Sequence, residues 1–284
     1  MSKALIVICD GTMQSLSSGN ALVAIARSIV PSEKQLVYYD PGVATLGTKW
    51  RKLFDGATGR GLMKNLKEAY CFLSSNYVKG DKIFLLGYSR GAATIRLLVD
   101  LMSRVGLLYP HQDNLIPQLF ETYLENDEDM LEALADMTTE EAPSIEQVIC
   151  FDTCFGNATE TANYVHLLSE YWKNSVKNLY HFMAAAETRA FLQPFRWLRR
   201  YDTVTDGYRE YFLQVDHSKI VFLETLKMYS LRLLLKAGVE LIKDDKPIGP
   251  YYPEKPWYSW LLPKKVRNLA YEGESFEGLH KILD

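Results

Sequence analysis

The chain lacks the features that would assign it to several protein classes. No apolar run reaches the length of about 20 residues that a transmembrane helix needs. The net charge of −3 gives no reason to expect a nucleic acid partner. The four cysteines show no zinc-type pairing, so we expect reduced thiols and a reducing compartment. With 48% hydrophobic and 24% charged residues, the composition is ordinary for a soluble globular protein.

The N-terminus also lacks the pattern of a secretory signal, which is a basic region, an apolar run and a small-residue cleavage site. Residues 1–10 instead contain one lysine followed by a strand-like apolar run. We therefore expect the protein to be cytoplasmic as made. Export would then use a secretion system that does not read a signal peptide.

Apolar runs of strand length alternate with helix-like segments along most of the chain. Strands are predicted over residues 4–9, 35–39, 83–86, 147–151, 178–185 and 210–215. Helices are predicted over residues 20–30, 62–76 and 92–105, with helical segments between 116 and 141. This alternation predicts an α/β fold of the α/β-hydrolase type, with a mostly parallel sheet flanked by helices. Polar residues at the strand ends place the functional site along that edge.

The amino-acid composition of the chain changes near residue 218. Residues 220–241 form a leucine-rich helical run, and residues 243–265 are rich in proline, tyrosine and tryptophan. We predict a catalytic domain over residues 1–218 and a helical and aromatic extension over residues 219–284 that packs on it. The alternative is an aromatic lid or a membrane-facing surface, with Leu261 and Leu262 ahead of Lys264 and Lys265 as the interfacial contact.

The segment Gly87-Tyr88-Ser89-Arg90-Gly91 lies between a predicted strand and a predicted helix. This is the context of a nucleophile elbow, in which a strained turn presents the serine at the carboxyl end of the sheet. Ser89 is therefore the predicted nucleophile. The alternative is an ordinary glycine-rich turn between a strand and a helix.

A serine nucleophile needs a base and a carboxylate that orients the base. Of the five histidines, His217 follows the last predicted strand and is the predicted base, whereas His181 lies early in a strand, where a structural role is expected. Asp152 ends the strand after the nucleophile strand and is the favoured acid. Other acids stay open at this stage, namely Glu187, Asp202, Asp206 and Asp216.

Two further aspartates, Asp10 and Asp40, end the first two strands on the same edge. They could orient water, bind a cation or shape a loop, although an aspartate at a strand end often only caps the next helix. The oxyanion hole is predicted from two backbone N–H groups. One belongs to Arg90, at the start of the helix, and the other to Gly11 or its neighbour Thr12.

Several short motifs then add up to a family resemblance over about residues 4–217. They are Cys9-Asp10-Gly11-Thr12, Tyr38-Tyr39-Asp40-Pro41-Gly42-Val43, Gly59-Arg60-Gly61-Leu62, Asn65, Ala69-Tyr70, Gly80-Asp81, the elbow with Ala92, Phe151-Asp152-Thr153-Cys154 and the segment His181 to Arg189. On these residues the chain resembles the α/β-hydrolase-like catalytic domains of type VI secretion phospholipase effectors. The resemblance implies esterase or phospholipase chemistry on acyl-ester lipids.

The chain departs from that family in its second half. Ala186 stands where the family has an aspartate, and the glycines that follow the family histidine are missing. An ungapped comparison puts Asp216, not His217, under that histidine. A shifted triad, a changed substrate and a catalytically degenerate fold all stay open.

The sequence thus predicts a serine hydrolase that cleaves carboxylic esters, of lipids or phospholipids, through an acyl-enzyme. This mechanism needs no metal or organic cofactor. The expected partners are the ester or lipid substrate and a membrane surface contacted peripherally, and the sequence leaves protein partners unknown. One alternative is a degenerate hydrolase that acts as a binding or adaptor protein. Another is a metal-assisted hydrolase that uses Asp10, Asp40 and Asp152.

Overall fold

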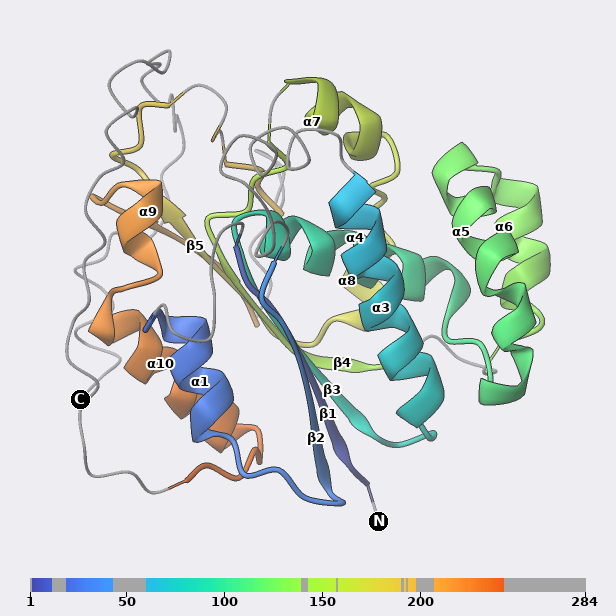
Figure 1. The fold of residues 1–284 in the computed structure, drawn as a ribbon, viewed down its shortest axis with the longest axis horizontal. Coiled ribbons are helices and arrows are strands. Elements are labelled where there is room, and N and C mark those ends of the chain that lie inside the picture. Colours follow the sequence, from blue (N-terminus) through green and yellow to red (C-terminus); the bar gives the residue numbers. More distant parts are fainter. Residues whose placement is uncertain are drawn as a thin grey trace, which may run out of the picture.

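Six parallel strands form one sheet in the order β2-β1-β3-β4-β5-β6, and helices cover both of its faces (Figure 1). The fold is seen in a computed structural model that describes residues 2–11, 19–42, 60–138, 143–156, 158–189, 192, 194–197 and 207–242 of the chain. The strands are β1 (Ala4–Cys9), β2 (Gln35–Asp40), β3 (Lys82–Tyr88), β4 (Ile145–Phe151), β5 (Leu179–Ala184) and β6 (Tyr208–Leu213). The predicted α/β class and parallel sheet are confirmed.

The central strands are buried on both faces, which is why they read as continuous apolar runs in the sequence. All six residues of β1 are buried. The register aligns Cys9 with Gly87 of β3, and Gly87 with Cys150 of β4. The residues that follow these strands therefore leave the sheet at the same edge, where Ser89 and Asp152 are found.

The helices divide between the two faces of the sheet. The helical elements are α1 (Ala21–Ser28), α3 (Arg60–Asn76), α4 (Arg90–Val105), η1 (Pro110–Leu115), α5 (Ile116–Glu125), α6 (Glu128–Ala135), α7 (Ala158–Val165), α8 (Trp172–Ser175), α9 (His217–Ile220) and α10 (Glu224–Lys236). One core cluster joins the sheet to α3, α4, α5, α6 and α8, and a second joins it to α1, α9 and α10 (Figure 1). The helical segments expected before residue 141 are α5 and α6.

The leucine-rich run after β6 differs from the continuous helix that the sequence predicts. It folds as the short helix α9, a turn at residues 221–223, and α10. The carbonyl of Val221 accepts a hydrogen bond from the N–H of Ala21, at 2.7 Å, so this part of the run is fixed by α1. Beyond α10, the N–H of Ile242 donates to Ser28, at 2.6 Å.

The predicted division at residue 218 stays a prediction. The proline- and aromatic-rich stretch, with Leu261, Leu262, Lys264 and Lys265, lies outside the described residues. Within the described part of the chain, no helix combines the length and the apolar character needed to cross a membrane.

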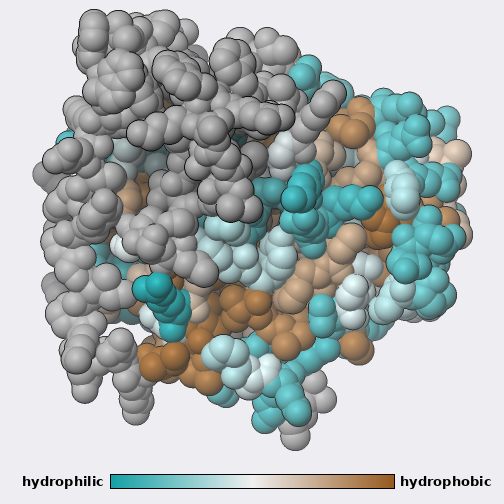
Figure 2. Space-filling model, viewed as in Figure 1, coloured by the Kyte–Doolittle hydropathy of each residue, from teal (hydrophilic) through white to brown (hydrophobic). Residues whose placement is uncertain are grey.

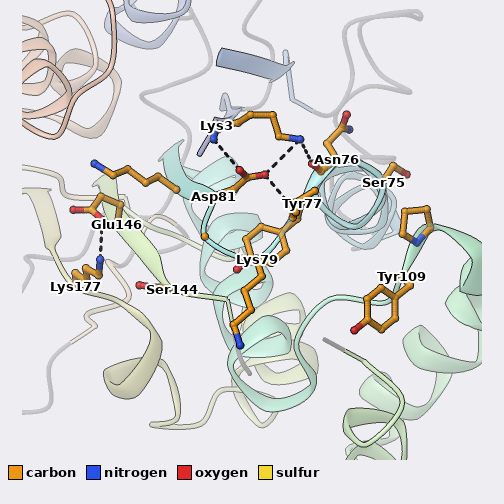
Figure 3. A pocket seen from close by; sticks show the side chains of 14 residues that line it. Lys3, Ser75, Asn76, Tyr77, Lys79, Asp81, Tyr109, Ser144, Glu146 and Lys177 are labelled. Atoms are coloured by element: carbon orange, nitrogen blue, oxygen red, sulfur yellow. Dashed lines mark hydrogen bonds and ion pairs between the residues drawn. The ribbon is translucent and has the colours of Figure 1, made fainter. Parts of the chain in front are cut away.

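A pocket of about 860 Å³ opens at the amino-terminal ends of the strands, opposite to Ser89 (Figure 3). It is lined by residues at the starts of β1, β3 and β4. Its charges are largely paired within the chain: Lys3 Nζ lies 3.4 Å from Asp81 and Lys177 Nζ lies 3.0 Å from Glu146. The pocket is separate from the elbow, and lysines outnumber carboxylates among the residues that line it.

The outer surface of α5 and α6 is mostly hydrophilic, with single hydrophobic residues between polar ones (Figure 2). Leu124 and Met130 are the exposed large hydrophobic residues of these two helices. Isolated apolar residues of this kind are normal on a protein surface and do not define a docking site.

Candidate active site

Ser89 lies on a strained turn between β3 and α4, with φ 57° and ψ −123°. The turn is possible because glycines flank it. A Cβ on Gly87 would lie 2.6 Å from the Cα of Ala92, and a Cβ on Gly91 would lie 2.5 Å from the carbonyl oxygen of Asp10. Side chains at both positions would therefore force strand and helix apart, which is the physical basis of the Gly-x-Ser-x-Gly spacing.

Ser89, His217 and Asp152 form one line of hydrogen bonds. His217 Nε2 lies 2.8 Å from Ser89 Oγ, and His217 Nδ1 lies 2.6 Å from Asp152 Oδ2. All three residues are buried. Asp152 is an acceptor, so the proton belongs on Nδ1, and Nε2 is left to accept from the serine hydroxyl. The structure thus brings together the three residues that the sequence predicts as nucleophile, base and acid.

The loop that carries Asp152 is also strained, with φ 44° at this residue. Its own N–H donates to Phe182 O at 2.6 Å, and its Oδ1 accepts from the N–H of Ala184 at 2.9 Å. Both partners belong to β5. The strand next to β4 therefore fixes the direction in which the carboxylate points.

His181 of β5 supports the same loop. Its Nε2 accepts from the N–H of Thr153 at 3.3 Å, and its Nδ1 lies 3.2 Å from Glu210 Oε1. Glu210 also accepts from Arg196 at 2.7 Å. Burial acts to raise the pKa of Glu210, but the contacts with His181 and Arg196 outweigh it and lower the pKa to about 2. These contacts support the structural role expected for His181.

Neither Glu187 nor Asp216 takes the place of Asp152 at Nδ1 of the imidazole. The Glu187 carboxylate accepts from the backbone N–H of His217 at 3.1 Å and pairs with Arg189 at 2.6 Å. Asp216 pairs with Lys219 at 3.4 Å and precedes α9 without a side-chain cap. Asp202 and Asp206 lie outside the described residues.

Two residues contact the site in ways that the sequence does not predict. Tyr88 stacks on the imidazole of His217, with ring centroids 5.1 Å apart, and its hydroxyl donates to the carbonyl of His217 at 2.9 Å. Cys154 Sγ lies 3.3 Å from Ser89 Oγ. Tyr88 is the variable position of the elbow motif, and Cys154 is two residues beyond Asp152. Neither position carries a sequence signal for such a contact.

The loop after β1 lies against the elbow. A Cβ on Gly11 would come within 3.4 Å of Ser89 Cβ. The N–H of Gly11 donates to Asp10 Oδ1 at 2.7 Å, and Asp10 Oδ2 accepts from Asn20 at 2.8 Å and from Tyr39 at 2.7 Å. Through these three hydrogen bonds, Asp10 holds the loop after β1 in place. Burial raises its pKa, and these hydrogen bonds oppose the shift.

Asp40 has fewer partners. Its Oδ1 accepts from the N–H of Gly42 at 2.8 Å, whereas its Oδ2 is buried with no hydrogen-bond partner among the described residues. Burial raises the pKa of Asp40 to about 6. In the part of the chain that the structure describes, no three His, Cys, Asp or Glu side chains come together as a metal-binding group. The cluster of Asp10, Asp40 and Asp152 that metal-assisted hydrolysis requires is thus not formed by these residues.

The sequence also matches a family model. Residues 3–221 match the model of the catalytic domain of Tle1-like phospholipase effectors of the type VI secretion system. This range holds every site residue named above and reaches β1 at one end and α9 at the other.

Individual relatives are more distant. An uncharacterized protein of Saccharomyces cerevisiae, YEL023C, is 29% identical over 105 residues, which cover 32% of this chain and 15% of the yeast protein. The crystal structure of an uncharacterized Pseudomonas aeruginosa protein is similar with a TM-score of 0.48 at 13% identity, over 84% of this chain and 46% of that one. A Tle1 effector, seen bound to a VgrG spike, gives a TM-score of 0.40 at 14% identity, over 78% and 51% of the two chains. The chain thus spans about half or less of the length of these relatives.

Proposed function

Since the chain belongs to the family of Tle1-like phospholipase effector catalytic domains, we propose that it is a serine hydrolase that cleaves carboxylic esters of lipids through an acyl-enzyme. The observation that carries the proposal is the line of hydrogen bonds from Asp152 through His217 to Ser89, with separations of 2.6 and 2.8 Å. A serine hydroxyl is a weak nucleophile at neutral pH, and this arrangement supplies the base that it lacks.

In the first half of the proposed reaction, Ser89 Oγ attacks the ester carbonyl carbon while its proton passes to His217 Nε2. The imidazole becomes positively charged, and Asp152 stabilises it without taking the proton from Nδ1. Collapse of the tetrahedral intermediate breaks the bond to the alcohol oxygen. That oxygen takes the proton from Nε2, so an alcohol leaves and the acyl group stays on Ser89.

The negative oxygen of the intermediate needs donors near Ser89. We assign one to the backbone N–H of Arg90, the first residue of α4, because a helix N-terminus carries partial positive charge. We assign the second to Gly11, whose backbone lies beside Ser89. The N–H of Gly11 would then turn from Asp10 Oδ1 to the oxyanion during the reaction.

In the second half, water replaces the alcohol. His217 Nε2 takes one proton from the water, and the oxygen attacks the acyl carbon. The bond to Ser89 Oγ then breaks, the serine recovers its proton from Nε2, and a carboxylic acid is released. The enzyme returns to its starting state with one ester bond hydrolysed.

We propose a phospholipid as the substrate class and peripheral contact with its membrane as the mode of access, as the phospholipase-effector family suggests. Membership of a secretion-effector family also supports export from the cytoplasm without a signal peptide. The adaptor alternative is less favoured, because a binding protein does not need a strained serine held against a buried histidine–aspartate pair.

The test is release of fatty acid from phosphatidylglycerol and phosphatidylethanolamine vesicles. We expect turnover by the wild-type chain and a loss of roughly 10³-fold or more in kcat for Ser89→Ala, His217→Ala and Asp152→Asn. Ser75→Ala, an exposed serine on α3, is the matched control and keeps full activity. A folded wild-type chain that hydrolyses neither vesicles nor a short-chain ester would favour the adaptor alternative.

A further inference from the structure

The backbone of His217 is held from both sides by two buried side chains. Its N–H donates to Glu187 Oε2 at 3.1 Å, and its carbonyl accepts from the Tyr88 hydroxyl at 2.9 Å. The two contacts come from different parts of the chain, the end of β3 and the loop after β5. Both are made to the same residue, whose imidazole stands between Ser89 and Asp152.

We propose that Tyr88 and Glu187 are positioning residues that fix the backbone of His217 and so direct its imidazole between Asp152 and Ser89. We call this pair the histidine clamp. The inference rests on the proposed serine-hydrolase function. It assigns to Glu187 a role that differs from that of a triad acid, and it gives Tyr88 a role that the elbow motif does not require.

The local backbone explains why a clamp is needed. His217 opens α9, a helix of four residues, and the preceding Asp216 gives it no side-chain cap. The first N–H groups of a helix have no partner within the helix, and a single turn adds few internal hydrogen bonds. The position of His217 therefore depends on tertiary contacts, and the two backbone hydrogen bonds of the clamp supply them.

Tyr88 also restricts the imidazole itself. Its ring is stacked on the His217 ring, with an angle of 28° between the two planes. Tyr88 is buried against the loop after β1, where a Cβ on Gly11 would come within 2.6 Å of the tyrosine ring. Tyr88 directly precedes Ser89 and contacts His217. This one residue therefore connects the turn that carries the nucleophile to the segment that carries the base.

Glu187 is itself held in place. Its Oε1 accepts from the Thr188 N–H at 2.9 Å and from the Arg189 N–H at 2.7 Å, and the Arg189 guanidinium adds bonds of 2.8 and 2.6 Å. Burial acts to raise the pKa of Glu187, but these contacts outweigh it and lower the pKa to about 2. The carboxylate is thus charged at neutral pH and presents a fixed acceptor to His217.

The experiment measures the second-order rate of fluorophosphonate labelling from pH 5 to 9, together with the thermal unfolding midpoint. Tyr88→Phe removes only the hydroxyl. We expect it to lower the labelling rate by about 10- to 100-fold, as a misplaced catalytic group does, in a protein that stays folded. Glu187→Ala should lower the rate similarly, and Glu187→Gln, which keeps an acceptor oxygen, should restore part of it.

Tyr123→Phe is the matched control. Tyr123 is also a buried tyrosine and donates to Asp100 at 3.2 Å, within the core cluster that packs on the opposite face of the sheet. Its hydroxyl can contribute to stability, but its loss should leave the labelling rate of the folded protein unchanged. A second readout is the proton NMR signal of the Nδ1–H of His217, which should broaden or shift in Tyr88→Phe and not in Tyr123→Phe.

The outcomes separate the two proposals. If wild type is labelled and Ser89→Ala is not, while Tyr88→Phe and Glu187→Ala both react at the wild-type rate, the histidine clamp is overturned and the serine hydrolase stands. If the variants lose stability without a change of rate or of the His217 signal, the two residues are merely structural, and the inference is equally overturned. A folded wild-type chain that takes no label overturns the proposed function and the clamp with it.

Discussion

At the scale of single residues, the carboxyl group of Asp40 has an environment unlike those of its neighbours on the same edge. Asp10 receives three hydrogen bonds and Asp152 contacts His217, whereas one oxygen of Asp40 is buried with no hydrogen-bond partner among the described residues. A buried carboxylate with one oxygen left without a partner is costly, so the neutral form of Asp40 is favoured in the folded protein.

This difference predicts how stability depends on pH. Burial raises the pKa of Asp40 from 3.8 to about 6, so its stabilising contribution is complete below pH 3.8 and is lost as the pH rises through 6. Asp40→Asn stays neutral and keeps an acceptor for Gly42. We expect this variant to be more stable than wild type at pH 8 by about 1–3 kcal/mol, with a smaller gain near pH 4.5.

Urea unfolding of both proteins at the two pH values measures this difference. A gain that is the same at pH 8 and pH 4.5 would show that the native pKa of Asp40 is not raised, and a loss at pH 8 would show that the ionised carboxylate is stabilised in the native state. Either result would contradict the environment described for this residue.

The sequence predicts some residues of the site and misses others. Ser89 is found because a strained turn requires glycines at fixed spacing, and the structure shows the close contacts that cause this. His217 and Asp152 are found because parallel strands end at one edge. Tyr88 and Cys154 are missed, because their contacts depend on side-chain directions and loop paths that no spacing encodes.

At the scale of elements, α10 shows how tertiary contacts override a simple pattern. The leucine-rich run predicts one helix, but the hydrogen bond from Ala21 to the carbonyl of Val221 fixes a turn between α9 and α10. The strands, in contrast, follow directly from their apolar runs, since both faces of the central strands are buried. The sequence therefore predicts whether a segment is a strand or a helix where its residues are uniformly buried. Where an element ends depends on contacts with neighbouring elements, which the sequence pattern does not show.

Two leucines of α10 test whether this helix belongs to the core. Leu226 has no exposed surface and packs in the cluster with α1 and the sheet, whereas Leu235 on the same helix is 59% exposed. We expect Leu226→Ala to lower the free energy of unfolding by about 2–5 kcal/mol. Leu235→Ala should change it by less than about 0.5 kcal/mol.

Chemical denaturation of both variants gives the comparison directly. Equal and small effects would mean that α10 contributes little to the core, which would favour a domain boundary near residue 218. A large effect of Leu226→Ala alone means that the core extends through α10.

At the scale of the whole molecule, the parallel sheet gathers the proposed chemistry at the carboxyl ends of its strands and leaves the lysine-lined pocket at their amino-terminal ends (Figure 3). Ser89 and Asp152 follow neighbouring strands, and His217 follows the last strand of the sheet. The alternation of strands and helices is sufficient to predict this arrangement. Which lipid the proposed site would accept depends on the surfaces around it, and the sequence pattern gives only the substrate class that the family suggests.

The most direct test of the central proposal is the site of covalent modification by a fluorophosphonate, found by peptide mass spectrometry of the labelled wild-type chain. We predict one adduct per chain, on Ser89, absent from Ser89→Ala and strongly slowed in His217→Ala. An adduct on another residue, or no adduct on a folded chain, would contradict the assignment of Ser89 as the nucleophile.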